Sequence, residues 1–75
     1  MQNICFSSNE FLDEVKYQIK TKYKNQNNYA KVIGYSRKAL NRILNSGEEI
    51  SINWVLTFCR NFDMKIEDYF SYKRG

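Results

Sequence analysis

The chain contains no histidine, only three glycines and only two cysteines in 75 residues. Histidine is the commonest general base and closely spaced glycines form the loops that cradle phosphates, so neither kind of catalytic site is expected. Cys5 and Cys59 stand far apart instead of forming a CxxC pair. With so few soft ligands, a tetrahedral zinc site is not expected either. We therefore predict that the protein is not an enzyme and holds no metal and no cofactor.

Long apolar runs are also missing. No stretch approaches the roughly 20 apolar residues that span a bilayer, and the opening residues MQNICFSSNE lack the charged start and apolar core of a secretion signal. Two lone cysteines in such a chain fit a reducing compartment, although the sequence leaves a disulfide open. We expect a cytoplasmic protein that makes no membrane contact. Its 43% hydrophobic and 16% aromatic content argues against disorder, and 75 residues make one domain.

Acidic residues are absent from the middle of the chain. Twelve Lys and Arg exceed eight Asp and Glu, which gives a net charge of +4. No acid lies between Lys16 and Arg42, a segment that holds these basic residues: Lys16, Lys20, Lys22, Lys24, Lys31, Arg37, Lys38 and Arg42. Positive charge without interspersed acid is typical of proteins that bind polyanions. The alternative is a solvated helix surface that is rich in lysine.

The segment from residue 26 to about residue 45, QNNYAKVIGYSRKALNRILN, predicts two short helices joined by a tight turn. Ala30 is small enough for a second helix to cross close above the first. Gly34 can take a positive φ in the turn, and Ser36 is a good N-cap for the second helix. An apolar pair three residues apart then faces the core: Leu40 and Ile43. This spacing is that of a helix-turn-helix.

The outward side of the second helix carries polar side chains suited to reading bases. These side chains are Arg37, Lys38, Asn41 and Arg42. Their spacings of one, three and four residues place them together on the side of the helix away from the apolar pair. Arg and Lys hydrogen-bond to guanine, and Asn pairs with adenine in bidentate fashion. The helix is therefore a candidate for insertion into the major groove of DNA. The alternative is an ordinary amphipathic helix whose charges face water.

A long helix is predicted before this pair. Ser7 and Glu10 have capping-box spacing and Phe6 and Phe11 form a hydrophobic staple, so the helix should run from Ser8 to about residue 24. Its apolar stripe recurs at helical spacing: Phe11, Leu12, Val15, Ile19 and Tyr23. Three lysines four residues apart form a second stripe: Lys16, Lys20 and Lys24. Their like charges repel each other, and bound phosphates would relieve that repulsion.

Two further helices are predicted after the pair. Ser51 caps a helix that ends near Asn61, with these residues facing inward: Ile52, Val55, Leu56, Cys59 and Phe62. A short fifth helix covers residues 66–70, and residues 1–6 and 71–75 are expected to be tails. Trp54 and Phe58 lie off the inward stripe. They either widen a small core or form a protein interface together with Leu44, Tyr69 and Tyr72.

The chain from about Asn25 to Phe70 resembles the lambda-repressor-like family of helix-turn-helix domains, which includes the Cro and C1 repressors. NQNNYAKVIGYS is similar to the family signature, with Asn25-Gln26 in its Thr-Gln places and Tyr29-Ala30 in its Leu-Ala places. SINWVLTFCRNFDMKIEDYF is similar to its closing helices. The chain departs from the family at three positions: Leu44 replaces a polar residue, Gly47 arrives one residue late, and Ile50 replaces a common proline.

The resemblance implies an all-α, compact five-helix domain with the helix-turn-helix at helices 2 and 3. It implies that the four outward residues of the second motif helix enter the major groove. Gln26, Ser36 and Asn45 would contact phosphates, and the charge pattern adds Lys20 and Lys24 to that set.

Two functions follow from these observations. The first is a small phage-type or prophage-type transcriptional regulator that binds operator DNA as a homodimer. The second is a protein-binding helix-turn-helix, an antirepressor or modulator that masks a repressor or another phage or host protein. Its surface would include Leu44 and the Trp54–Phe58 face.

Overall fold

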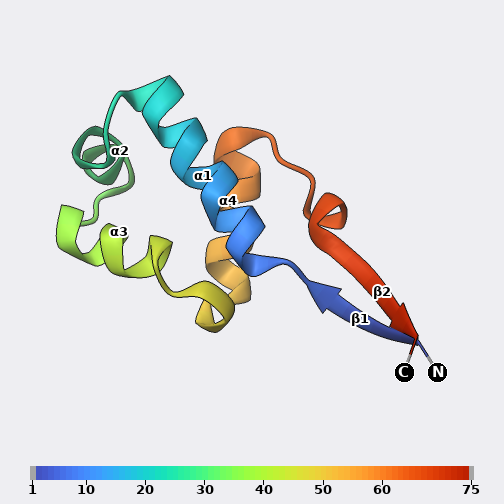
Figure 1. Cartoon of the computed structure of the whole chain (residues 1–75). Coiled ribbons are helices and arrows are strands. Elements are labelled where there is room, and N and C mark those ends of the chain that lie inside the picture. The colour runs from blue at the N-terminus through green and yellow to red at the C-terminus, as the bar shows by residue number, and fades with distance from the viewer. Residues whose placement is uncertain (1, 75) are drawn as a thin grey trace.

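The computed structural model describes the backbone of residues 2–74 and the side chains of residues 5–70. The described part is mostly helical, with four α-helices and two 3₁₀ turns: α1 (Ser8–Tyr23), α2 (Gln26–Ile33), α3 (Arg37–Leu44), η1 (Gly47–Glu49), α4 (Ile52–Phe62) and η2 (Ile66–Tyr69). The expected fifth helix is therefore only the 3₁₀ turn η2. Two strands, β1 (Gln2–Phe6) and β2 (Phe70–Arg74), form a ribbon that projects from the helices (Figure 1).

The ribbon corrects the prediction that both ends of the chain are tails. Its strands are antiparallel, with Gln2 opposite Arg74 and Phe6 opposite Phe70. The rings of Phe6 and Phe70 lie 5.2 Å apart, and the Phe6 ring lies 5.5 Å from that of Phe11 in α1. The aromatic contacts thus anchor the base of the ribbon to the helical core, while its tip points away from α2 and α3 (Figure 1).

Helix α1 begins at the predicted residue for only one of the two predicted reasons. The staple between Phe6 and Phe11 is formed. The capping box is not formed, because the Ser7 side chain makes no capping hydrogen bond and its ψ of 75° is not the extended conformation that a cap requires. The Ser7 N–H instead donates to the Tyr69 carbonyl at 2.7 Å, which ties the start of α1 to η2.

The core lies between α1, α2, α3 and α4 and is rich in aromatic rings. Tyr29 is fully buried, with ring centroids 5.0 Å from Tyr23, 5.1 Å from Phe62 and 6.4 Å from Phe58. The predicted apolar stripe of α1 is confirmed for its first four residues, while Tyr23 is half-buried. Among the described side chains of residues 5–70, the buried apolar residues are Phe11, Leu12, Val15, Ile19, Tyr29, Ala30, Leu40, Leu44, Val55, Phe58 and Phe62.

Helix α4 is rotated relative to the prediction. Phe58 is fully buried between the rings of Phe11 and Tyr29, whereas Ile52 is 60% and Leu56 51% exposed. Apolar residues surround most of this helix, so periodicity alone left several faces available to the core. The face that carries the large Phe58 ring fills the space between α1 and α2, and the inward assignment of Ile52 and Leu56 is wrong.

Candidate nucleic-acid interface

Helices α2 and α3 are joined by a turn whose conformation depends on Gly34. This residue is left-handed, with φ 78° and ψ 27°. The Tyr35 N–H donates to the Ala30 carbonyl at 2.9 Å and the Gly34 N–H to the Lys31 carbonyl at 3.4 Å. This is a Schellman ending, and it reverses the chain directly after α2. The predicted role of Gly34 is confirmed.

Side-chain caps begin both helices, and neither cap is acidic. The Asn25 Oδ1 accepts from the Asn28 N–H at 2.9 Å, and the Ser36 Oγ accepts from the Ala39 N–H at 3.1 Å. Neither helix has an acidic residue in its first turn. Both positive helix ends therefore keep their attraction for an anion.

The polar residues of α3 lie on its solvent-facing side. Leu40 is buried as predicted, but Leu44 is the second buried residue and Ile43 is only half-buried. The four residues predicted to face outward, and Asn45 directly after the helix, are all exposed: Arg37, Lys38, Asn41, Arg42 and Asn45. Successive helical residues are about 100° apart, so these five occupy an arc of about 140°. An α-helix with its side chains is about 10–12 Å in diameter, which matches the width of the major groove.

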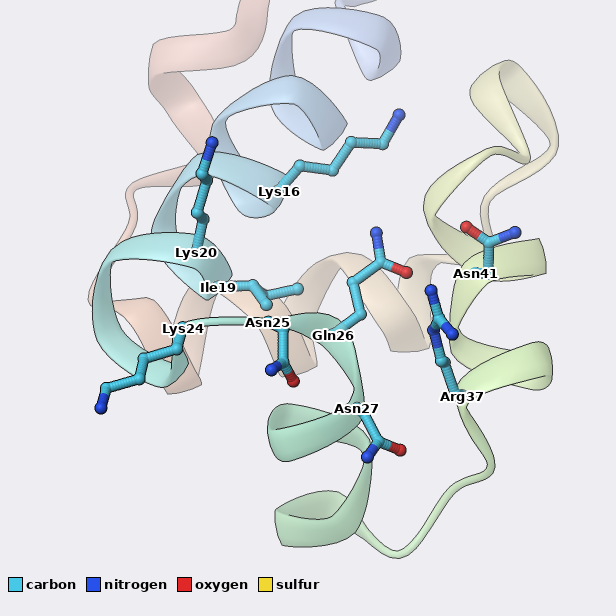
Figure 2. A pocket seen from close by; sticks show the side chains of 9 residues that line it. All are labelled: Lys16, Ile19, Lys20, Lys24, Asn25, Gln26, Asn27, Arg37 and Asn41. Carbon is cyan, nitrogen blue, oxygen red and sulfur yellow. The ribbon is translucent and has the colours of Figure 1, made fainter.

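A hollow of about 590 Å³ lies between α1, α2 and α3, and we call it the basic groove (Figure 2). Its lining comes from all three helices and the α1–α2 junction: Lys16, Ile19, Lys20, Lys24, Asn25, Gln26, Asn27, Arg37 and Asn41. Figure 2 shows Gln26 between the lysines of α1 and the Arg37 and Asn41 side chains of α3. The lining contains four cations and no carboxylate.

The basic groove brings together five of the nine residues predicted to contact DNA: Lys20, Lys24, Gln26, Arg37 and Asn41. Lys38 shares a shallower hollow with Arg37 and Asn41 on the outer side of α3. Ser36, Arg42 and Asn45 line neither hollow. Asn25, Asn27 and Lys16 were not among the predicted site residues. The i,i+4 lysine stripe was the one sequence signal that could have added Lys16.

A hydrogen-bonded chain of side chains links α1 to the end of α3. The Lys16 Nζ donates to Asn45 Oδ1 at 3.2 Å. The Asn45 Nδ2 donates to the Asn41 carbonyl at 2.8 Å and to Asn41 Oδ1 at 3.1 Å. A carbonyl-type oxygen has two lone pairs, so Asn41 keeps an acceptor site as well as its amide donors. The contact positions Asn41 and leaves free the amide groups that an asparagine uses when it pairs with adenine.

The predicted protein interface is only partly exposed. Leu44 is 1% exposed and Phe58 is fully buried, so both belong to the core and neither can form a free surface. Trp54 is half-buried and lies edge-on to Tyr35, with ring centroids 5.0 Å apart. Tyr69 is half-buried against Phe11. The Tyr72 side chain lies outside the described side chains.

Neither cysteine forms a disulfide: Cys5 and Cys59 are both free thiols. Burial, and then the carboxylate of Glu67, raise the pKa of Cys59. Within residues 2–74 no group of three Cys, Asp or Glu side chains is arranged to hold a metal. The helices of the same residues include none that is long and apolar enough to cross a bilayer.

Comparisons of this chain with protein-family models, with curated proteins and with solved structures found no match.

Proposed function

We propose that the protein is a small transcriptional regulator of the phage or prophage type, which binds operator DNA through α2 and α3 acting as a helix-turn-helix. One observation carries this proposal. The basic groove and the exposed polar side of α3 meet at Arg37 and Asn41 and form one surface without a carboxylate. Such a surface fits a phosphate backbone beside a base edge.

The residues around α3 and the basic groove divide into base-reading and phosphate-binding roles in the proposed complex. On α3, Arg37, Lys38, Asn41 and Arg42 face the base edges in the major groove. Around the basic groove, Gln26 and the start of α2 hold one phosphate. The remaining phosphate contacts come from side chains at the edges of the surface: Lys16, Lys20, Lys24, Ser36 and Asn45.

The proposal includes a fold relationship. The domain is a variant of the lambda-repressor-like arrangement in which the fifth helix is reduced to η2 and a terminal ribbon is added. Two copies bind a pseudo-palindromic site with half-sites about one helical turn apart.

Fluorescence anisotropy with a labelled duplex at several salt concentrations tests DNA binding. Each phosphate neutralised contributes about −0.9 to the slope of log K against log salt, so the three lysine contacts predict a slope near −3. Lys20→Gln should make that slope shallower by about one. Arg60→Gln removes the same charge from an exposed position on α4 outside the basic groove and is the matched control.

Base reading is tested on a duplex selected from a random library. Arg37→Ala should cost about 1–3 kcal/mol on the selected site and relax the preference at one base pair. A flat, weak anisotropy response at low salt would refute DNA binding itself. Normal affinity and specificity of Arg37→Ala would refute the assignment of α3 as the reading helix.

A further inference from the structure

A second hollow, of about 460 Å³, lies where the base of the ribbon meets α4, and we call it the apolar groove. Its walls come from β1, α4, η2 and the start of β2, and they include Phe6, Ile50, Ile52, Ile66 and Phe70. None of the residues of the basic groove lines it. DNA bound to α3 would therefore leave this groove free.

Large apolar side chains of the apolar groove face solvent. Ile52 is 60% exposed and Phe70 is 40% exposed. Leu56, one turn after Ile52 in α4, is 51% exposed. Leu56 does not line the apolar groove, so two of these exposed residues, Ile52 and Phe70, share the hollow. Isolated exposed apolar residues are common, but a hollow that holds two of them favours a site for a partner.

Ser8 gives this site an unused polar group. Its side chain is 4% exposed and lines the apolar groove. Its Oγ has no hydrogen-bond partner within the described part of the chain. A buried hydroxyl without a partner is unfavourable. The Oγ is itself closed to solvent, so a bound molecule would reach it only after the Ser8 side chain changes rotamer.

The charge beside the apolar groove is negative. Glu48 lines the groove, and an adjoining hollow shares Glu48 and Ser8 and adds Glu10. Neither hollow is lined by Lys or Arg. The basic groove has the opposite character.

We propose that the apolar groove docks a basic amphipathic segment of a partner protein. An apolar side chain of that segment enters between Ile52 and Phe70, and a Lys or Arg beside it pairs with Glu48 or Glu10. The pattern is that of an amphipathic segment in an apolar groove, with specificity added by charge.

The acidic rim argues against two other occupants. DNA and anionic lipid carry the same charge as Glu48 and Glu10 and would be repelled. A second copy of this chain in a two-fold contact would place the same surface against itself, acid facing acid. This inference does not depend on DNA binding by α3.

Binding of a synthetic peptide tests the proposal. The probe is a fluorescein-labelled, 16-residue helical peptide with leucine on one face and lysine on the other, titrated with the full chain at physiological salt. The control peptide has glutamate in place of lysine. We expect a micromolar Kd for the lysine peptide. Any weaker binding of the glutamate peptide should be to the basic groove and should persist in Ile52→Asp. Ile52→Asp and Glu48→Lys should each weaken binding at least tenfold.

The variants are chosen so that folding is preserved. Ile52 is exposed and begins α4 directly after the Ser51 cap, where an aspartate is favourable. Glu48 is exposed in η1. Arg37→Ala is the matched control, because it weakens the proposed DNA surface and should leave peptide affinity unchanged. Ile52→Asp should conversely retain the salt-dependent DNA binding of the unmodified chain.

Alkylation of the two thiols locates the bound peptide. Cys5 lines the apolar groove and Cys59 does not, so peptide should protect Cys5 from iodoacetamide at least several-fold and leave Cys59 unchanged. Three results would each overturn the proposal. They are an affinity of Ile52→Asp for the lysine peptide equal to that of the unmodified chain, equal binding of the glutamate and lysine peptides, and no protection of Cys5. A dimer in sedimentation that Ile52→Asp dissociates would also overturn it, because the occupant would then be a second copy.

Discussion

At the scale of single residues, the backbone conformation of Gly34 decides whether α3 can follow α2 so closely. A left-handed conformation costs an ordinary L-residue roughly 1–2 kcal/mol because its Cβ approaches the following carbonyl. A Cβ added to Gly34 would meet no atom within 4 Å, so the surrounding structure adds no clash. The requirement for glycine here is purely conformational.

Gly34→Ala should therefore lower the free energy of unfolding by about 1 kcal/mol. Gly34→Asn is the control, since asparagine tolerates the left-handed region and should lose less. Urea unfolding of the three proteins measures the difference. Equal losses for Ala and Asn would show that space, and not φ, limits this position.

The hydroxyl of Tyr29 makes stability depend on alkaline pH. Burial raises its pKa above the usual value near 10, although the hydrogen bond donated by the Asn61 Nδ2 at 2.6 Å acts in the opposite direction. The folded state thus favours the protonated phenol. This contribution to stability is complete below about pH 10 and is lost as the pH rises through the folded pKa, because the unfolded chain loses its proton first.

Unfolding free energies measured from pH 8 to 11.5 should fall more steeply above pH 10 in the unmodified protein than in Tyr29→Phe. Burial also raises the pKa of Tyr69, so some alkaline loss should persist in the variant. If the unfolding free energies of the two proteins fell in parallel, the pKa of Tyr29 would not be raised in the folded state.

At the scale of elements, α1 carries a conflict between its own stability and the proposed binding of phosphate. Like charges four residues apart destabilise a helix by about 0.2–0.5 kcal/mol per pair. Lys20 makes one such pair, with Lys16, because α1 ends at Tyr23 and Lys24 follows it in a left-handed conformation. All three lysines line the basic groove. Bound phosphates would turn this repulsion into attraction.

Lys20→Ala should therefore stabilise the free protein by a few tenths of a kcal/mol and weaken binding to every duplex about equally. Thermal unfolding and anisotropy on the same sample measure the two effects. Lys31→Ala in α2 removes the same charge outside the basic groove and is the control. Loss of stability together with loss of DNA binding would indicate a structural role for Lys20.

Helix starts that depend only on residues nearby in the sequence were predictable. Ser36 and Ser51 cap the helices expected of them, because a cap requires only a side chain within three residues of its N–H partner. The rotation of α4 was not predictable, since it depends on the space that α1 and α2 leave for Phe58. The same limit applies to the candidate site: its α3 residues follow from periodicity, whereas Lys16 reaches α3 only through tertiary packing.

At the scale of the whole molecule, the ribbon was the largest feature missed. Each strand is five residues long and pairs with the opposite end of the chain, so no local pattern could identify its partner. A two-stranded ribbon alone is marginally stable in water. Here Phe6 supplies packing, because its ring contacts both Phe11 and Phe70.

Phe6→Ala should lower the free energy of unfolding by about 2 kcal/mol, less than for a fully buried ring. Hydrogen exchange should show the ribbon amides losing protection while α2 and α3 keep theirs. Tyr17→Ala, at a position 63% exposed, should change neither quantity. Equal loss of protection in α3 would mean that the ribbon and the basic groove unfold as one unit.

The pairing of Gln2 with Arg74 also determines how the protein would respond to mechanical force. A load applied at these two positions pulls the strands apart along the direction of their hydrogen bonds, which lie perpendicular to antiparallel strands. The bonds would then break one pair after another, from the tip toward Phe6, and not all together in shear. The ribbon would lengthen at low force before any tension reached α1 or the groove beside α3.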